Sequence, residues 1–415
     1  MAINQPLLAQ RLKKAREASQ ITQEQAADVL GIPRTAIVHI EAGNRSVSTL
    51  ELAELANLYR RDIASFFSEE ETTVDDDALL ALYRVAPAFR DDPRLQESAA
   101  NCIRICSEGR VLEEILDIPR RSGPPAYGLP TPRSAAEAVQ QGQRVAIEER
   151  KRLGVGDSPV SDMADIISTQ GVWASGVDQL PDGMSGLFLR HPSIGMVILV
   201  NYDHPRNRKR FSYAHEFAHC LLDRNQPVSV TTLDNQSNLS EVRANSFAAA
   251  FLMPEGGVNS FLNSLDKGGS SRQTLHVYSP AGPPDGSTTE ARRRPVPGSQ
   301  RIVYQDVVQL ARHFGVSYVA AVYRLKNLER ITQTECTALI DNGPHALNYQ
   351  KLLDIANDSG TEQVLDRHLV IQVAYLAVEA YRRGEISRGK LLEVSKILDL
   401  DGKELVALAK AALDE

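Results

Sequence analysis

The sequence predicts a mainly α-helical protein with a small β-sheet, an α+β fold class. Segments with helical apolar spacing and cap residues recur at both ends of the chain. Two short apolar runs, Leu187–Leu189 and Met196–Val200, flank a turn at 191–195 and indicate strands. The 415 residues are 42% hydrophobic and 24% charged, which is typical of two or three globular domains. This composition excludes wholesale disorder, collagen and a disulfide-stapled miniprotein.

Cysteine usage and the first residues indicate the compartment. The four cysteines fit no C-x-x-C pattern and indicate reduced thiols in a cytosolic protein. The start, MAINQPLLAQRLKK, lacks a basic flank followed by an apolar run, and no apolar run is long enough to span a bilayer. We therefore expect a soluble cytoplasmic protein without a membrane partner.

The net charge of −7 hides a local feature. Six acids and no base fall within residues 69–77, so this solvated block alone supplies −6 of the total. Residues 1–68 carry eight Lys and Arg against seven Asp and Glu. Nucleic-acid binding therefore has to be judged domain by domain.

Proline marks the main domain boundary. Five prolines lie within 119–132, where they end helices and stiffen a linker. The helix expected before this loop, over 78–118, carries an apolar set that includes Ile103, Val111 and Ile115. We expect four parts: helical 1–68; 69–133, with the acidic linker, helices and the proline-rich linker; mixed 134–330; and helical 331–415.

The first part predicts short helices in quick succession. One covers Leu8–Ala18, and Thr22 can cap the next. Gly31 permits a left-handed turn, and a third helix is expected from Pro33 to about Glu41. The third helix turns Ile37 and Ile40 inward and Arg34, Thr35, Val38 and His39 outward.

The run TQEQAADVLGIPRTAIVHIEAGNRSVSTLELAELA resembles the Cro/repressor (XRE-type) helix-turn-helix family. The resemblance implies that residues 33–41 enter the major groove of a double-stranded DNA operator, and that Glu41 pairs with Arg16. It implies base contacts by Arg34, Thr35 and His39, and phosphate contacts by Gln23, Arg45 and Ser46. Because the charge of the segment is modest, we expect a homodimer on two half-sites. The alternative is a small helical bundle that docks protein partners.

Cap residues predict the later helices. Ser134 and Glu137 form an S-x-x-E capping box, so a helix is expected from there to about Leu153, ending at Gly154. The remaining helices are expected near 160–170, from about Asn207, from about Ser240, over 387–398 and from Gly402.

A second motif lies in FSYAHEFAHCLL, where His215, Glu216 and His219 form H-E-x-x-H. Positions i and i+4 share one helix face, so the two imidazoles can take adjacent corners of a zinc tetrahedron. Glu216 lies beside them and can act as the general base toward water. With nine His in 415 residues, the chance expectation for this pattern is about 0.01. The alternative is two ordinary histidines on an amphipathic helix.

The helix near Ser240 supplies a third candidate ligand. Glu241 lies 22 residues after His219, a suitable distance for a ligand from a neighbouring helix. Asn245 lies one turn further on the same face and is placed to support a ligating histidine. Three protein ligands leave one position open for water, as in catalytic zinc sites, so we expect Zn²⁺ as the cofactor.

The segments RFSYAHEFAHCLLD and EVRANSFAAAFLMP resemble the ImmA/IrrE family of metallopeptidases, over residues 134–330. The resemblance implies zinc ligands at His215, His219 and Glu241, with Glu216 as the general base.

Further features accompany this region. The edge of the strand Val197–Asn201 is expected, from the resemblance, to align a substrate chain by backbone pairing. Val307–Leu328 is a helix–glycine–helix segment expected to pack within the peptidase domain, and Cys220 is expected to be a packing residue. Residues 263–300, rich in Gly, Ser and Pro, predict a long mobile insertion. A basic cluster, Arg206, Arg208, Lys209 and Arg210, is interpreted as a solvated or acid-paired surface, with DNA phosphate contact as the minor alternative.

Together the two motifs predict a DNA-binding regulator with a zinc endopeptidase domain. Tethering to DNA raises the local concentration of the peptidase beside proteins on the same operator. The resemblance implies a protein substrate that is itself a repressor or another helix-turn-helix regulator, whose cleavage relieves repression. The alternative is a non-enzymatic repressor or antitoxin-like factor whose peptidase fold only senses a ligand or binds a partner. A housekeeping peptidase is disfavoured because it would not need an exposed recognition helix.

Overall fold

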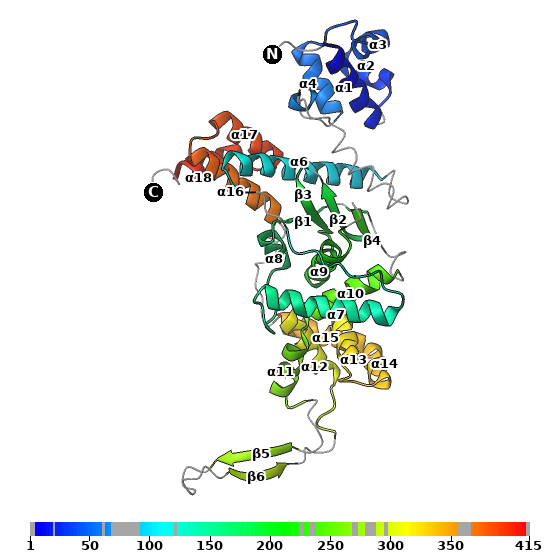
Figure 1. The fold of residues 1–415 in the computed structure, drawn as a ribbon, viewed down its shortest axis with the longest axis vertical. Helices are drawn as coiled ribbons and strands as arrows, with labels where there is room; N and C mark the ends of the chain where they lie inside the picture. Colours follow the sequence, from blue (N-terminus) through cyan, green and yellow to red (C-terminus); the bar gives the residue numbers. More distant parts are fainter. Residues whose placement is uncertain are drawn as a thin grey trace. The chain divides into compact units, whose positions relative to one another are not determined.

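The structure is a computed structural model of the chain (Figure 1). It forms two compact units, residues 1–81 and most of 82–415, which are considered separately. The described residues are 5–19, 21–59, 63–67, 92–119, 123–178, 180–181, 183–191, 193–224, 228–232, 238–267, 273–278, 288–293, 298–355 and 367–411. Within these ranges no helix has the length and apolarity needed to cross a membrane.

The first unit is a bundle of short helices whose ends follow from cap residues. The elements are α1 (Gln5–Ala18), α2 (Gln23–Leu30), α3 (Arg34–Glu41), α4 (Thr49–Leu58) and the 3₁₀ turn η1 (Ile63–Phe66). Thr22 accepts a hydrogen bond from the amide of Gln25, whose side chain accepts from the amide of Thr22 in return. Gly31 then adopts a φ of 62°, which allows the chain to turn sharply into α3.

Packing of α3 against its neighbours confirms the predicted inward face. Ile37 and Ile40 are buried, and they share a core with Leu12 of α1, Ala26 of α2 and Leu55 of α4. The outward side chains of α3 take no part in this core and are exposed to solvent.

A mixed four-stranded sheet organises the second unit. Its strands are β1 (Trp173–Val177), β2 (Met184–His191), β3 (Gly195–Asn201) and β4 (Val228–Thr232). Their order is β1-β3-β2-β4, with β1 parallel to β3 and β4 antiparallel to β2. The expectation that Val197–Asn201 offers a free edge is wrong, because β3 is paired on both sides. Among the described residues the edge strands are β1 and β4, and the sequence analysis predicted neither of them.

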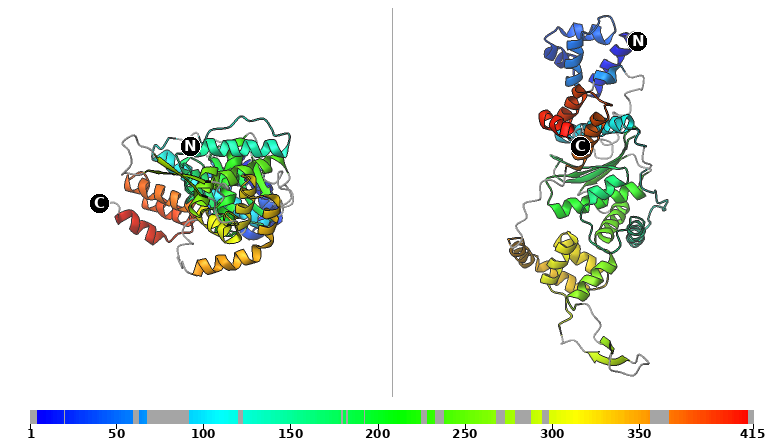
Figure 2. Two further views of the ribbon diagram at one scale, coloured as in Figure 1. Left: turned by 90° about the horizontal axis from the view of Figure 1, so that it is seen from below. Right: turned by 90° about the vertical axis from the view of Figure 1, so that its left-hand side faces the viewer.

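Helices cover both faces of this sheet (Figures 1 and 2). On one face, α6 (Pro93–Ile115) and α16 (His368–Arg382) contact β1 and each other. On the other face lie α8 (Met163–Thr169) and α9 (Arg206–Leu222). Of the apolar set that indicated this helix, Val111 is exposed, whereas the neighbouring Leu112 is fully buried.

Two long helices, α7 (Ala135–Arg152) and α10 (Leu239–Leu252), pack very closely against each other. The second of them, α10, also packs against α9. Gly142 allows the approach, because a Cβ there would lie 2.8 Å from the backbone nitrogen of Phe247. As predicted, Ser134 caps α7 by accepting from the amide of Glu137. The Glu137 carboxylate accepts from the amide of Arg133 and not from that of Ser134, so only the serine half of the capping box is formed.

The remaining helices follow the sheet in the chain. They are α11 (Glu255–Ser264), α12 (Tyr304–Phe314), α13 (Tyr318–Asn327), α14 (Gln333–Asp341), α15 (Gly343–Ile355), α17 (Arg388–Ile397) and α18 (Gly402–Ala411). The expected helix–glycine–helix segment is confirmed as α12, Gly315 and α13, and its apolar side chains join the main core. Residues 263–300 differ from the expected loop, because they hold an antiparallel hairpin of β5 (Gln273–Tyr278) and β6 (Thr288–Arg293).

Candidate functional site

Two adjacent helices bring the three predicted ligands together. His215 and His219 lie one turn apart on α9, and Glu241 lies in the first turn of α10. His215 Nε2 is 3.0 Å from Glu241 Oε2 and 3.1 Å from His219 Nε2, which is 3.4 Å from Glu241 Oε1. All three side chains are buried. The ligand atoms therefore converge on one point inside the protein.

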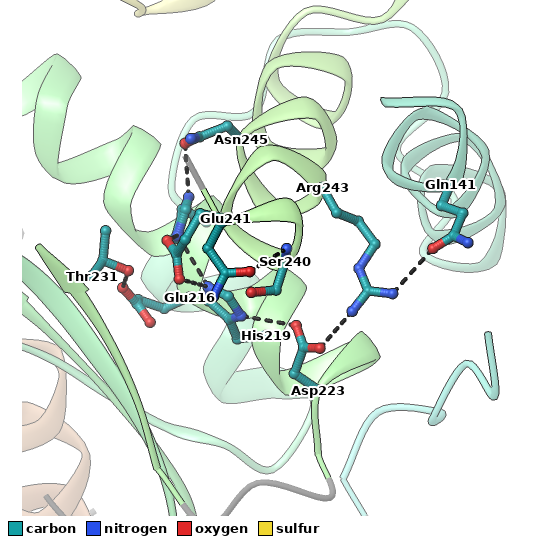
Figure 3. Close-up of polar contacts among 11 residues, drawn as sticks. Gln141, Glu216, His219, Asp223, Thr231, Ser240, Glu241, Arg243 and Asn245 are labelled. Carbon is teal, nitrogen blue, oxygen red and sulfur yellow. Dashed lines mark hydrogen bonds and ion pairs between the residues drawn. The ribbon is translucent and has the colours of Figure 1, made fainter. Parts of the chain in front are cut away.

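Hydrogen bonds on the far side of each ring fix which nitrogen faces that point. His215 Nδ1 lies 2.9 Å from Asn245 Oδ1. His219 Nδ1 lies 2.9 Å from Asp223 Oδ2 (Figure 3). Because a carboxylate only accepts, Nδ1 of His219 carries the proton, and the same holds for His215 opposite an amide oxygen. Both rings therefore turn Nε2 toward that point, where a metal ion can take the place of a proton.

These distances fit a divalent metal ion. Tetrahedral zinc with metal–nitrogen distances of about 2.0–2.1 Å separates its ligand atoms by about 3.4 Å. The three pairs of atoms, at 3.0 to 3.4 Å, are close to that spacing. Two imidazoles and one carboxylate are also a donor set that zinc prefers, and they leave one coordination position open.

The electrostatics of this cluster favour a positive charge at the same point. Burial raises the pKa of Glu241, but hydrogen bonds to His215 and His219 outweigh it and lower that pKa to about 2. Burial lowers the pKa of His219, yet its bonds to Asp223 and Glu241 raise it to about 10. The carboxylates thus stabilise a cation between the two helices.

A buried ion pair supports His219 from behind, and sequence reasoning missed it. Arg243 donates to Asp223 Oδ1 at 2.5 Å and to Gln141 Oε1 of α7 at 3.0 Å (Figure 3). Arg243 is only 3% exposed, so its charge depends on Asp223 for compensation. These contacts, from Gln141 through Arg243 and Asp223 to His219, link the candidate metal site to the packing of α7 against α10.

Glu216 lies in a closely fitted slot beside the ligands. It is fully buried, and its Oε1 accepts a 2.6 Å hydrogen bond from the Thr231 hydroxyl on β4. Gly186 of β2 makes room, because a Cβ there would lie 2.9 Å from Oε1. Oε2 is buried without a hydrogen-bond partner among the described residues. Complete burial raises the pKa of Glu216, while the two imidazoles counteract the rise.

Cys220 follows the second histidine but takes no part in the cluster. Its thiol is buried and lies 3.5 Å from the sulfur of Met196. Burial raises the pKa of Cys220 to about 12, so the thiol stays protonated at neutral pH. The expected packing role fits these surroundings.

The helix-turn-helix unit presents a separate polar face. Arg34, Thr35 and His39 are exposed on α3, and Ser46 is exposed after it. Gln23 is held within the unit, since it donates to Glu41 at 3.0 Å and lies 3.5 Å from Arg34. Arg45 forms an ion pair of 2.7 Å with Glu51.

The expected structural pair is present below this face. Arg16 binds both carboxylate oxygens of Glu41, at 2.5 and 3.0 Å, and also donates to the carbonyl of Ile21. Hydrogen bonding to Glu41 raises the pKa of Arg16, despite the opposing effect of burial. This pair fixes α3 to α1 and thereby the orientation of the outward residues.

Comparison with known protein families agrees with both sites. Residues 12–66 match the Helix-turn-helix family, and residues 179–271 match the IrrE N-terminal-like domain. The second match contains the H-E-x-x-H helix and Glu241. No curated protein matches the chain. The chain therefore joins an XRE-type helix-turn-helix domain to a metallopeptidase-type domain like those of IrrE and ImmA.

Proposed function

We propose that this protein is a DNA-binding regulator whose zinc-dependent endopeptidase domain cleaves a repressor or another helix-turn-helix regulator. The observation that carries the proposal is the convergence of His215, His219 and Glu241 on one point, with Glu216 beside it. A cluster that only stabilised the fold would have no need of a buried carboxylate oxygen without a partner among the described residues.

The chain's own residues divide the chemistry among them. The three ligands would hold Zn²⁺, which supplies Lewis acidity toward the scissile carbonyl. Glu216 Oε2 takes a proton from the attacking water and returns it to the leaving amine. Thr231 holds the other carboxylate oxygen in place. Among the described residues β4 is an edge strand of the sheet, and this strand, which carries Thr231, is suited to pair with an extended substrate.

On the DNA side, the exposed residues of α3 would read the operator. Arg34, Thr35 and His39 reach base edges, while Ser46, Gln23 and Arg45 contact phosphates. Gln23 and Arg45 would exchange part of their present bonds to Glu41 and Glu51 for those contacts. A homodimer would place two such helices on the two half-sites of the operator.

The peptidase proposal is tested with Glu216→Gln in the full-length protein. The amide keeps the shape of the side chain but cannot accept the proton, so cleavage of a candidate repressor should fall at least about 100-fold. Zinc content should remain at one ion per chain, because Glu216 is not a ligand. Glu148→Gln, on the exposed face of α7, is the matched control and should cleave normally. Unchanged cleavage by Glu216→Gln would refute the mechanism.

The DNA-binding proposal has an independent test. Arg34→Ala should weaken operator binding by about 1–3 kcal/mol and relax specificity at one base pair. Arg45→Ala should weaken binding to all sequences alike and reduce the salt dependence. Operator binding with no cleavage of any candidate repressor would leave the non-enzymatic regulator as the better description.

A further inference from the structure

A small pocket lies between the start of α8 and the first turns of α9, apart from the metal ligands. It is lined by residues 161–164 and by Arg206, Lys209, Arg210 and Tyr213. We call it the α8–α9 pocket. Its wall carries three cationic side chains and one acid, Asp162, so its net charge is positive.

The single acid of the pocket is already engaged. Asp162 Oδ1 accepts a 3.1 Å hydrogen bond from the amide of Asp165 and so caps α8. Asp162 Oδ2 lies 2.9 Å from Nε2 of His368 on α16. Each carboxylate oxygen thus already has one partner, and a single negative charge faces three cations across the pocket.

Of these cations, Arg210 has the surroundings that most clearly call for a bound anion. Its guanidinium packs against the backbone of Gly315, where a Cβ would meet Nη2 at 3.2 Å. Its Nε is buried and has no hydrogen-bond partner among the described residues. Burial lowers the pKa of Arg210, and the neighbouring Arg206 lowers it further, while Asp162 counteracts them. Holding a charged, poorly hydrogen-bonded guanidinium in such a place is costly unless an anion completes it.

The other two cations complement this arrangement. Arg206 lies one turn before Arg210 on α9, and so faces the same side of the helix. Lys209 stands over the ring of Tyr202, with its ammonium 4.4 Å from the ring centroid. Arginine forks and an ammonium around one small pocket are the groups that proteins use to bind phosphate.

We propose that the α8–α9 pocket binds a phosphate-sized dianion, either inorganic phosphate or the phosphate of a small monoester. The site is distinct from the metal centre, although Tyr213 lines it and lies only two residues before His215 on α9. Residues 206–210 were interpreted from sequence as a solvated or acid-paired surface. Arg210 departs from both descriptions, because it is partly buried and forms no ion pair with an acid among the described residues.

Calorimetric titration of the full-length protein tests this site. Inorganic phosphate and glycerol phosphate are titrated separately at constant ionic strength, with chloride as the reference anion. We expect one saturable site for phosphate, and the relative affinity of the monoester identifies which source fits better. Arg210→Gln should weaken binding at least about 10-fold. Arg208→Gln is the matched control, because Arg208 is exposed on the same helix and bonds Ser185 instead.

Thermal unfolding gives a second readout that also reports folding of the variants. Phosphate at about 100 times its dissociation constant should raise the melting temperature by about 4 °C in the wild type and in Arg208→Gln. It should have no such effect in Arg210→Gln. If that variant does not fold, Arg206→Gln takes its place and should also bind more weakly. The proposal is overturned if binding is not saturable, if chloride competes equally, if both Arg208 and Arg210 variants lose the same affinity, or if only duplex DNA binds.

Discussion

The ion pair between Asp223 and Arg243 makes a sharp prediction about what positions the metal ligand. Asp223 serves two groups at once, since Oδ2 accepts from His219 and Oδ1 accepts from Arg243. Asp223→Asn keeps the shape of the side chain but removes its charge. Arg243→Met removes the cation and keeps an unbranched side chain of similar length. The two changes together form a double-mutant cycle.

The magnitudes follow from burial. Arg243 is 3% exposed, so the loss of its carboxylate partner should destabilise the metal-free protein by about 3 kcal/mol. The double variant has no uncompensated cation, so its deficit should shrink to about 1 kcal/mol. Zinc affinity should behave differently. It should fall about 10- to 100-fold in both variants that carry Asp223→Asn, because His219 has lost its charged acceptor in each.

Two measurements separate these effects. Urea unfolding in the presence of a chelator, followed by the fluorescence of Trp173, gives the stability of the metal-free protein; the chain has one tryptophan. Competition against a chromophoric chelator gives the zinc affinity. Asp165→Asn, an exposed change in the same unit, is the control and should alter neither quantity. Recovery of zinc affinity in the double variant, or strictly additive stabilities, would refute the reasoning.

Three further changes test other parts of the structure. Glu41→Gln should destabilise the helix-turn-helix domain by about 2–4 kcal/mol, because the nearly buried Arg16 loses its anion; thermal unfolding of that domain measures this. Gly109→Ala should cost about 1–3 kcal/mol and alter the fluorescence of Trp173, since the new Cβ would lie 2.8 Å from the indole ring. Burial raises the pKa of Asp162, but hydrogen bonds from His368 and from the amide of Asp165 outweigh it and lower that pKa. The stability that Asp162 contributes should thus be complete above its unfolded pKa of about 3.9 and disappear as the pH falls further, so urea unfolding of Asp162→Asn should differ from wild type at pH 7 and converge with it in acid.

Local geometry explains which parts of the site were predictable from sequence. The spacing of His215 and His219 sets their common face on any α-helix, whatever surrounds it. Likewise, Thr22 and Gly31 act on the backbone within a few residues, and the predicted ends of α2 agree with the structure.

Tertiary contacts explain what sequence reasoning missed. Thr231 meets Glu216 only because β4 joins the edge of β2, and the short polar run of β4 gives little sign of a strand. Arg243 finds its place through α7, about one hundred residues earlier in the chain. Val111, one of the apolar residues that indicated the helix, is exposed. Contact with α16 selects the buried face of α6, and no local pattern indicates that contact.

The interior position of β3 determines which fragment of the chain can be expressed as a folded peptidase-type domain. A fragment trimmed to the matched residues 179–271 would omit β1, leaving one side of β3 with unpaired amides and carbonyls. The same fragment would lack α7 and with it Gln141, so Arg243 would lose one of its acceptors. Such a truncated product should be poorly soluble, whereas a piece spanning 92–411 retains β1 to β4 together with α6, α8, α9 and α16.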